Sequence, residues 1–418
     1  MKLCTIGLGY IGLPTSIMFA SHDVDVVGVD VNQEVIDKLN HGTIHIEEPG
    51  LQDALESVLY VEKFRAASKP EKADVFILSV PTPNKQDEYL SCDLTYVKQA
   101  TDSIIPYLEK GNVVIIESTI APRTMDDHVK PQLEEAGFII GEDIYLVHCP
   151  ERVLPGKIMQ ELVENNRIVG GVTPQCTEKG AEVYETFVKG EIIKTDARTA
   201  EMSKLMENTF RDVNIALANE LTKVCNDLSI NVLEVIRMAN KHPRVNLHTP
   251  GPGVGGHCLA VDPYFIIAKS PENSPIIQLA RETNNAMPDY VVESTKKLLA
   301  KHNGKKVTVF GLTYKGDVDD IRESPAMEIY EKLRTDDALD VVAYDPHVNL
   351  SFVEKNLDAA LENADLVLVL SDHSQFKYLK GASFEKMRTA QVFDTKNIVE
   401  EYNETLTYIN YGNLYAFL

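Results

Sequence analysis

Short apolar runs alternate with longer amphipathic stretches through the first half of the chain, the pattern typical of a parallel α/β sheet. Six runs have the length and composition of buried strands: Lys2–Ile6, Val24–Asp30, Ala73–Val80, Asn112–Glu117, Ile144–Cys149 and Asn166–Gly170. Helical patterns fill the intervals between them. This order predicts a doubly wound sheet, in which ligands lie beyond the carboxyl ends of the strands.

The alternation stops near residue 199 and returns near the C-terminal end. Residues 199–239, rich in Glu, Leu, Met and Asn, indicate helix throughout, and residues 274–301 indicate a second helical segment. Four more strands are expected after Gly304: Lys306–Gly311, Leu339–Tyr344, Ala364–Leu370 and Gln391–Phe393. We therefore predict an α/β protein in which two Rossmann-like doubly wound domains, 1–195 and 303–418, are joined by a central helical region, 196–302.

A glycine pattern follows the first predicted strand. Gly7, Gly9 and Gly12 fit GxGxxG, and Asp30 ends the second predicted strand eighteen positions after Gly12. In this context the glycines permit a tight turn, let backbone N–H groups approach a pyrophosphate and let the helix pack on the strand. An aspartate in this place accepts hydrogen bonds from ribose hydroxyls and repels a 2′-phosphate, which favours NAD over NADP. A glycine-rich turn that binds no ligand is the alternative.

Three other strands end in polar residues that we expect in the same crevice. These endings are Pro81-Thr82-Pro83, Glu117-Ser118-Thr119 and His148-Cys149-Pro150-Glu151. One such ending is a routine loop, whereas three that follow a dinucleotide pattern indicate a site.

A second glycine-rich loop, residues 251–256, leads to Cys258, and Asp262 follows four residues later. A cysteine is more often a small core residue than a nucleophile. The glycines weaken that interpretation, since they permit close approach of a ligand and expose N–H groups that favour a thiolate.

The long helical segment carries polar residues at helical spacing. Lys204, Asn208 and Arg211 lie four and three positions apart, so a helix places them on one stripe. The opposite side is expected to pack through five residues: Met202, Leu205, Thr209, Val213 and Ala216. A solvated polar face is the alternative for the stripe.

Charge and cysteine content narrow the class of protein. Acidic residues outnumber basic ones by 63 to 41, which argues against binding to nucleic acid or to an anionic membrane surface. The six cysteines are scattered without metal-ligand spacing, so we expect reduced thiols and no metal. No apolar stretch reaches the roughly 20 residues of a membrane span. We expect a cytoplasmic enzyme, and we interpret the apolar segment up to Ala20 as a strand and helix rather than a signal peptide.

The chain resembles the UDP-glucose/GDP-mannose dehydrogenase family along essentially its whole length. Seven segments carry the resemblance, in the order of the family: Gly7–Pro14, Val80–Pro83, Glu117–Thr119, Cys149–Glu151, Lys204–Asn208, Gly255–Asp262 and Thr313–Pro325. The resemblance implies an N-terminal NAD domain, a central dimerisation region and a C-terminal domain for the UDP part of a UDP-sugar. It also implies a homodimer or dimer-based oligomer, and oxidation of a primary alcohol to an acid with two NAD and one water.

The resemblance assigns roles to individual residues. It makes Cys258 the nucleophile that attacks a C6 aldehyde, giving a thiohemiacetal and then a thioester. Lys204 and Asn208 stabilise negative charge on the C6 oxygen. Thr119 and Asp262 organise a water for proton transfer, and Glu151 is the base for hydrolysis of the thioester.

The binding residues that the resemblance implies form two groups. The cofactor group is Gly7, Gly9, Tyr10, Ile11, Gly12, Asp30, Pro81, Thr82, Thr119 and Arg322. The substrate group is Glu151, Arg152, Lys204, Asn208, Arg211, Arg244, Gly255 and Lys315. For Arg244, Lys315 and Arg322 an ordinary surface charge is the alternative.

One segment of the sequence bears on the identity of the sugar. The segment His257–Phe265 resembles that of bacterial enzymes that oxidise UDP-N-acetylmannosamine, and Val261 stands where UDP-glucose enzymes commonly carry a lysine. UDP-N-acetylglucosamine, UDP-N-acetylgalactosamine and UDP-glucose remain alternatives. Two other functions are open: a two-electron hydroxyacid dehydrogenase and a non-catalytic NAD-binding regulator. Cys258 separates the first of them, because only a four-electron oxidation requires it.

Overall fold

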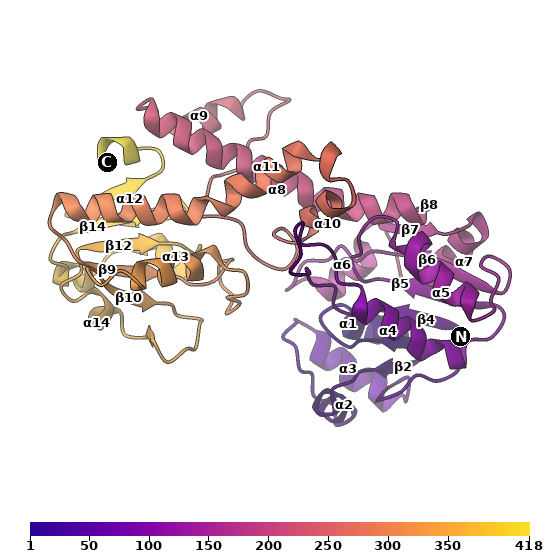
Figure 1. The fold of residues 1–418 in the computed structure, drawn as a ribbon. Helices are drawn as coiled ribbons and strands as arrows, with labels where there is room; N and C mark the ends of the chain where they lie inside the picture. The colour runs from indigo at the N-terminus through magenta and orange to yellow at the C-terminus, as the bar shows by residue number, and fades with distance from the viewer. The chain divides into compact units, whose positions relative to one another are not determined.

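The computed structural model describes residues 1–418 and contains two compact units (Figure 1). The first unit is Met1–Glu207 with Tyr264–Pro271, and the second is Asn208–Pro263 with Glu272–Leu418. Each unit has its own sheet and core. No helix combines the length and the apolar character that crossing a membrane requires.

The first unit is built on an eight-stranded sheet of order β3-β2-β1-β4-β5-β6-β7-β8. Its strands are β1 Lys2–Ile6, β2 Asp25–Val29, β3 Phe64–Ala67, β4 Val75–Leu78, β5 Asn112–Ile116, β6 Ile144–His148, β7 Arg167–Gly171 and β8 Ile192–Asp196. All six predicted strands are present. The expectation of a wholly parallel sheet was wrong at one edge, because β7 pairs antiparallel with β6 and parallel with β8.

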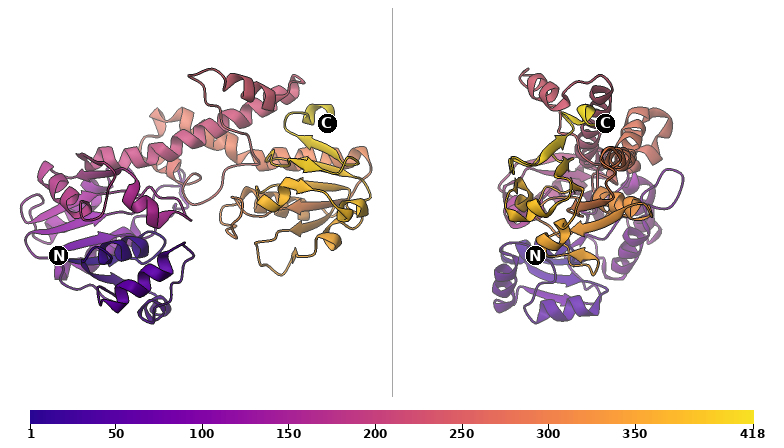
Figure 2. Two further views of the ribbon diagram at one scale, coloured as in Figure 1. Left: turned by 180° about the vertical axis from the view of Figure 1, so that it is seen from behind. Right: turned by 90° about the vertical axis from the view of Figure 1, so that its left-hand side faces the viewer.

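Helices cover both faces of this sheet (Figures 1 and 2). They are α1 Gly12–Ala20, α2 Gln33–Asn40, α3 Leu51–Tyr60, α4 Thr95–Ile104, α5 Lys130–Glu135, α6 Ile158–Glu164 and α7 Pro174–Tyr184. Every residue of α1 is buried, because this helix packs between the sheet and α3 and α6. The start of α1, where a dinucleotide would bind, is thus held rigidly.

The central helices differ from the prediction in where they break. They are α8 Ala197–Asp227, α9 Val232–Ala239, α10 Asp262–Lys269, α11 Pro275–Asn285 and α12 Met287–Lys301. The expected continuous helix over residues 199–239 ends after 31 residues of α8. Ser229 has a left-handed φ of 57°, and the Asn231 side chain caps α9 by accepting from the N–H of Glu234, so a turn and a new helix start replace the continuous helix.

The second unit is built on a six-stranded parallel sheet of order β11-β10-β9-β12-β14-β16. Its strands are β9 Lys306–Phe310, β10 Asp340–Tyr344, β11 Val353–Glu354, β12 Leu366–Val369, β14 Gln391–Asp394 and β16 Thr407–Asn410. The helices α13 Pro325–Arg334 and α14 Leu357–Leu361 flank it, and a small second sheet pairs β13 Tyr378–Leu379 with β15 Glu401–Tyr402. The four strands predicted for this part of the chain are confirmed.

Both faces of the second sheet are buried. Along β12, Leu366 and Leu368 belong to one hydrophobic cluster, whereas Val367 and Val369 belong to the other. Successive side chains of a strand point to opposite faces, so a strand covered on both sides is apolar at every position. This explains why these strands were recognisable as continuous apolar runs.

Candidate active site

The glycine turn between β1 and α1 has the geometry of a dinucleotide-binding loop. Gly7 has φ 92°, and a Cβ added there would lie 2.5 Å from the carbonyl oxygen of Ser79. A Cβ at Gly12 would lie 1.9 Å from the carbonyl oxygen of Gly7, so only glycine lets α1 begin against the turn. At Gly9 there is nothing within 4 Å of a Cβ, which leaves that side of the turn open to a ligand.

Asp30 is oriented beside this turn by backbone hydrogen bonds. Its Oδ2 accepts from the N–H of Leu8 at 3.0 Å, and its Oδ1 accepts from the N–H of Asn32 at 2.9 Å. An ionised carboxylate has about four lone-pair sites, so acceptor capacity remains for ribose hydroxyls. The arrangement fits NAD. Tyr10 is exposed and Ile11 is half-buried on the same turn.

The ends of β4 and β5 are tied together, as the crevice prediction requires. The Thr82 hydroxyl donates to the carbonyl oxygen of Thr119 at 2.6 Å. The Ser118 hydroxyl accepts from the N–H of Val80 at 2.8 Å. Thr82 and Thr119 are therefore neighbours, and Pro81 directly precedes Thr82 on the same loop.

Glu151 and Arg152 lie in the loop after β6. One Glu151 oxygen accepts from the N–H of Arg152 at 2.7 Å, and the other contacts the Arg167 guanidinium. The Arg152 guanidinium donates to both oxygens of Glu207, at 2.6 and 3.1 Å. This pair ties the loop to α8, so any role of Arg152 in substrate binding competes with its ion pair.

On α8 the predicted polar stripe is present. Lys204 and Asn208 are half-buried and Arg211 is exposed. On the opposite side Leu205, Thr209 and Ala216 are buried as predicted, and Val213 is half-buried. Met202 was predicted to pack and is instead 37% exposed. Its spacing explains this, because it begins an exposed apolar stripe that runs along α8 to the residue directly after it: Met202, Met206, Phe210, Leu217, Val224 and Leu228.

The predicted nucleophile lies in a short turn with the predicted aspartate. The carbonyl oxygen of Cys258 accepts from the N–H of Asp262 at 2.9 Å, and Asp262 begins α10. The Asn208 amide donates to Asp262 Oδ2 at 2.6 Å. Cys258 is exposed, whereas the other five cysteines are buried. Exposure argues against the interpretation of Cys258 as a core residue.

The glycine loop before Cys258 packs against a second motif of the sequence. A Cβ at Gly255 would lie 2.3 Å from the carbonyl oxygen of Glu323, and one at Gly256 would lie 2.9 Å from the Tyr314 ring. Larger residues would separate the loop from the segment 313–325. The fold thus brings together two of the segments that carried the family resemblance.

The three remaining predicted cations are exposed: Arg244, Lys315 and Arg322. The Arg322 guanidinium donates to both oxygens of Asp320, at 2.8 and 2.7 Å. Burial, and after it the charge of Arg322, lower the pKa of His257. Arg322 therefore acts electrostatically on the residue directly before Cys258.

The predicted site residues fall into two partial sets. Thr119, Glu151 and Lys204 belong to the first unit, whereas Asn208, Asp262 and Cys258 belong to the second. Within each unit, the structure fixes the positions of these side chains relative to one another. That the two sets bind one substrate is a prediction from the sequence.

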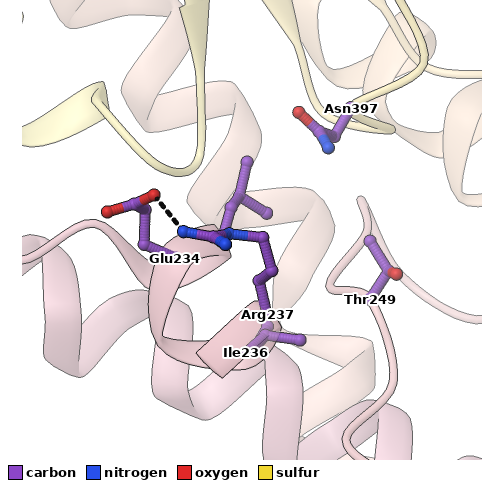
Figure 3. Close-up of a pocket in the computed structure, with 6 residues that line it drawn as sticks. Glu234, Ile236, Arg237, Thr249 and Asn397 are labelled. Carbon is purple, nitrogen blue, oxygen red and sulfur yellow. Dashed lines mark hydrogen bonds and ion pairs between the residues drawn. The ribbon is translucent and has the colours of Figure 1, made fainter. Parts of the chain in front are cut away.

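Two other features of the second unit do not belong to the predicted site. A cavity of about 330 Å³ is lined by Leu233, Glu234, Ile236, Arg237, Thr249 and Asn397 (Figure 3). None of the predicted residues lines it. A cluster of Asp317, His347 and His373 has the composition of a metal site, but the His373 nitrogens already bond the N–H of Asp317 at 2.8 Å and the Asp345 carboxylate at 3.2 Å.

A buried charge cluster beside Glu151 was not predicted. It consists of Arg167 and Glu117 with Tyr184. Glu117 belongs to the predicted strand ending Glu117-Ser118-Thr119, but nothing in the sequence indicated a role for its carboxylate. Arg167 and Tyr184 gave no signal except that an arginine starts an otherwise apolar strand.

Comparison with known proteins supplies matches over the whole chain. Three models of the UDP-glucose/GDP-mannose dehydrogenase family match in order: its NAD binding domain at residues 1–188, its central domain at 198–286 and its UDP binding domain at 308–401. A solved structure of UDP-N-acetyl-mannosamine dehydrogenase from Staphylococcus aureus is 66% identical, with a TM-score of 0.95 and full coverage of both chains.

Two curated relatives differ in the activity that they are named for. UDP-N-acetyl-D-mannosamine dehydrogenase from Methanocaldococcus jannaschii is 48% identical over 404 residues, which are 95% of this chain and 92% of the relative. NDP-N-acetyl-D-galactosaminuronic acid dehydrogenase from Ralstonia nicotianae is 45% identical over 412 residues, which are 95% of this chain and 96% of the relative.

Proposed function

The chain belongs to the UDP-glucose/GDP-mannose dehydrogenase family, and from this membership we propose that it oxidises the C6 alcohol of UDP-N-acetyl-D-mannosamine to a carboxylate with NAD. The sugar is the one in the names of the S. aureus and M. jannaschii relatives. One observation carries the proposal: an exposed thiol, Cys258, lies in one turn with Asp262, which accepts a hydrogen bond from Asn208.

The proposal assigns a separate role to each of three parts of the chain. Residues 1–195 bind NAD, residues 196–302 carry the cysteine loop and the dimerisation helix, and residues 303–418 bind the UDP part of the substrate. The ranges matched by the three family models support these boundaries. The open side of the turn at Gly9 and the orientation of Asp30 support the assignment of the cofactor.

Four residues act in the first oxidation. NAD bound to the first unit supplies the hydride acceptor for both oxidations. Lys204 and Asn208 stabilise the negative charge that develops on the C6 oxygen when its proton leaves. Thr119 and Asp262 hold the water that takes up this proton. Removal of one preorganised donor of this kind typically costs about 3 to 4 kcal/mol in the barrier.

Cys258 and Glu151 act on the resulting aldehyde. The Cys258 thiolate adds to the aldehyde carbon, and the thiohemiacetal loses a second hydride to become a thioester. Glu151 removes a proton from the water that attacks the thioester, and the thiolate leaves. In total, one alcohol and one water become a carboxylate, two hydrides and three protons. The covalent bond retains the aldehyde while one cofactor is exchanged for the next.

We propose a homodimer in which α8 forms the contact. The exposed apolar residues Phe210, Leu217 and Val224 recur at intervals of seven along this helix, which places them on one side, and exposed Leu228 directly follows its last residue. A stripe of this kind is typical of a helix that packs against a partner. We also infer a cytoplasmic location, since the mechanism depends on an exposed reduced thiol and reducing compartments preserve thiols.

The test is the stoichiometry of the reaction. Purified protein is incubated with NAD and a panel of UDP-N-acetylmannosamine, UDP-N-acetylglucosamine, UDP-N-acetylgalactosamine and UDP-glucose, and NADH per sugar consumed is recorded. We expect a ratio of two and the fastest turnover with the mannosamine derivative. Cys258→Ala should abolish acid formation, whereas the same change at buried Cys225 should preserve it. A ratio of one would favour the two-electron dehydrogenase, and no NADH with any sugar would favour the regulator.

A further inference from the structure

An arginine and a second glutamate are buried beside Glu151 in the first unit. Arg167 starts β7, and Glu117 directly follows β5. The side chains of Arg167 and Glu117 are 5% and 0% exposed, and that of Glu151 is 8% exposed. A single cation therefore lies between two carboxylates that are almost completely removed from water.

The positive charge of Arg167 is shared among several groups that contact its guanidinium. The same Arg167 nitrogen, Nη2, contacts Glu151 Oε2 and lies 3.4 Å from Glu117 Oε1. The guanidinium carbon lies 4.3 Å from the centre of the Tyr184 ring, and Nε donates to Cys149 Sγ at 3.3 Å. Glu117 accepts two further bonds, from the Tyr184 hydroxyl at 2.7 Å and the Ser79 hydroxyl at 2.9 Å.

The loop that carries Glu151 has little freedom to escape this cluster. Arg152, the next residue, is paired with Glu207. Further along, the buried Glu48 carboxylate accepts from the N–H groups of Gly156 and Ile158, both at 2.7 Å. These two anchors, both after Glu151 in the chain, therefore hold its loop in place and keep the carboxylate against Arg167.

An arginine that pairs with one carboxylate alone makes it a weak base, because the cation stabilises the ionised form. A second carboxylate on the same guanidinium opposes this effect. We propose that Arg167 and Glu117 are positioning residues for Glu151: Arg167 fixes the carboxylate, and ionised Glu117 shares the guanidinium and so keeps Glu151 a strong enough base to activate water. The inference rests on the proposed function, in which Glu151 promotes hydrolysis of the Cys258 thioester.

The protonation states of the cluster support this division of roles. Burial raises the pKa of Glu117 to about 7, although Arg167 lowers it, and the charge of Glu151 raises it further. Two other titratable groups contact Arg167, and both stay neutral near pH 7. Burial raises the pKa of Cys149 to about 12 and that of Tyr184 well above its usual range. Near pH 7, Glu117 is therefore the member of the cluster that changes charge.

This assignment predicts a rise in the hydrolysis rate as Glu117 loses its proton near pH 7. Hydrolysis is isolated by single-turnover reactions with NAD and UDP-N-acetylmannosamine, quenched at intervals and followed by intact-mass measurement of the sugar adduct on Cys258. In Glu117→Gln, which stays neutral, we expect the rise to disappear. The adduct should accumulate, with hydrolysis about 10-fold slower above pH 8, because an arginine that is no longer shared makes Glu151 a weaker base.

A second variant tests the same idea without removing the carboxylate. Tyr184→Phe keeps the ring against the guanidinium but removes the hydroxyl that stabilises ionised Glu117. We expect the rise in the hydrolysis rate to persist and to move to higher pH. This variant decides the question if Glu117→Gln does not fold, as judged by its circular dichroism and melting temperature (Tm).

Two outcomes would overturn the inference. In the first, folded Glu117→Gln keeps the native pH dependence of hydrolysis, or hydrolyses the thioester more slowly by the same factor at every pH. The role of Glu117 would then be structural only. If Tyr184→Phe left the midpoint of the rise in place, Glu117 would not be the group that titrates. The proposed function fails in a different way, since the native protein would then form no Cys258 adduct and fewer than two NADH per sugar.

Discussion

At the scale of single residues, Glu201 shows how a buried carboxylate organises the predicted site. It lies on α8, three positions before Lys204, and is 0% exposed. Its two oxygens accept from the N–H groups of Arg123 at 2.6 Å and Met125 at 2.8 Å. These bonds anchor the segment that follows Thr119 to the helix that carries Lys204.

Burial raises the pKa of Glu201 from near 4.5 to about 7, although the two N–H donors lower it. Because the folded pKa lies above the unfolded one, the folded state binds more protons between about pH 4.5 and 7. The stability contributed by this group is therefore complete at low pH and is lost as pH rises through that window. The loss is at most about 3.5 kcal/mol, because each pKa unit corresponds to about 1.4 kcal/mol.

We predict that Glu201→Gln gains stability relative to the native protein as pH rises from 5 to 8, because glutamine cannot ionise. The free energies of unfolding are measured by urea denaturation at both pH values. Glu135→Gln, at an exposed residue, is the control, and its free energy of unfolding should differ from that of the native protein by the same amount at pH 5 and pH 8. If Glu201→Gln also differed from the native protein by the same amount at both pH values, the raised pKa of Glu201 would be contradicted.

At the residue scale, the sequence named candidate residues only where they stand next to a recognisable motif. Asp30, Cys258 and Asp262 stand at fixed distances from glycine motifs, and the structure places Asp30 beside the first glycine turn and Cys258 and Asp262 together in one turn. Their roles stay predictions. Arg167 and Glu201 could not be found in this way, because their partners lie on other elements, 16 to 78 residues distant in the chain. Only the folded sheet brings such partners together.

At the scale of elements, two of the three glycines of the first turn allow effects on stability and on cofactor binding to be separated. A Cβ at Gly12 would collide with the Gly7 carbonyl, whereas a Cβ at Gly9 meets nothing within 4 Å. We predict that Gly12→Ala lowers the free energy of unfolding by about 1 to 3 kcal/mol, as overpacking does. Gly9→Ala should leave Tm unchanged and weaken NAD binding at least about 10-fold, or 1.4 kcal/mol.

The pair is measured by thermal unfolding and by calorimetric titration with NAD, each variant being the control for the other. A Gly9→Ala protein with native affinity would place the cofactor elsewhere than at this turn. A Gly12→Ala protein of native stability would contradict the close packing of α1 against the Gly7 carbonyl.

The accuracy of the element prediction follows burial. Strands buried on both faces, such as β4 and β12, are apolar at every position and were recognised. The missed strands lie at edges or are very short. β3 has the exposed Arg65 within four residues, and β8 is exposed or half-buried at every position. An edge strand needs no apolar run, so its sequence resembles that of a loop.

At the scale of the whole molecule, the order of domains was predictable and their mutual placement was not. Apolar periodicity is a local property, and it identified two sheets separated by helices. Placement depends on side chains that meet across domains, which no local pattern records. Helix α8 adds one observation at this scale. With its buried side identified in the structure, its exposed side is seen to carry a stripe of apolar residues.

This stripe yields a prediction about assembly. Leu217 is 50% exposed in the middle of α8, so a charge there would be buried by a partner helix but solvated in a monomer. Burial of an unpaired charge in an interface costs several kcal/mol, whereas the same charge on the exposed surface of a monomer costs almost nothing. We therefore expect Leu217→Glu to convert a dimer to a monomer, measured by light scattering during size-exclusion chromatography. Tyr60→Glu, at a residue of α3 that is 89% exposed, should leave the dimer intact. A Leu217→Glu protein with the native mass would exclude α8 as the contact, because a symmetric helix pair places two such charges in one dry interface.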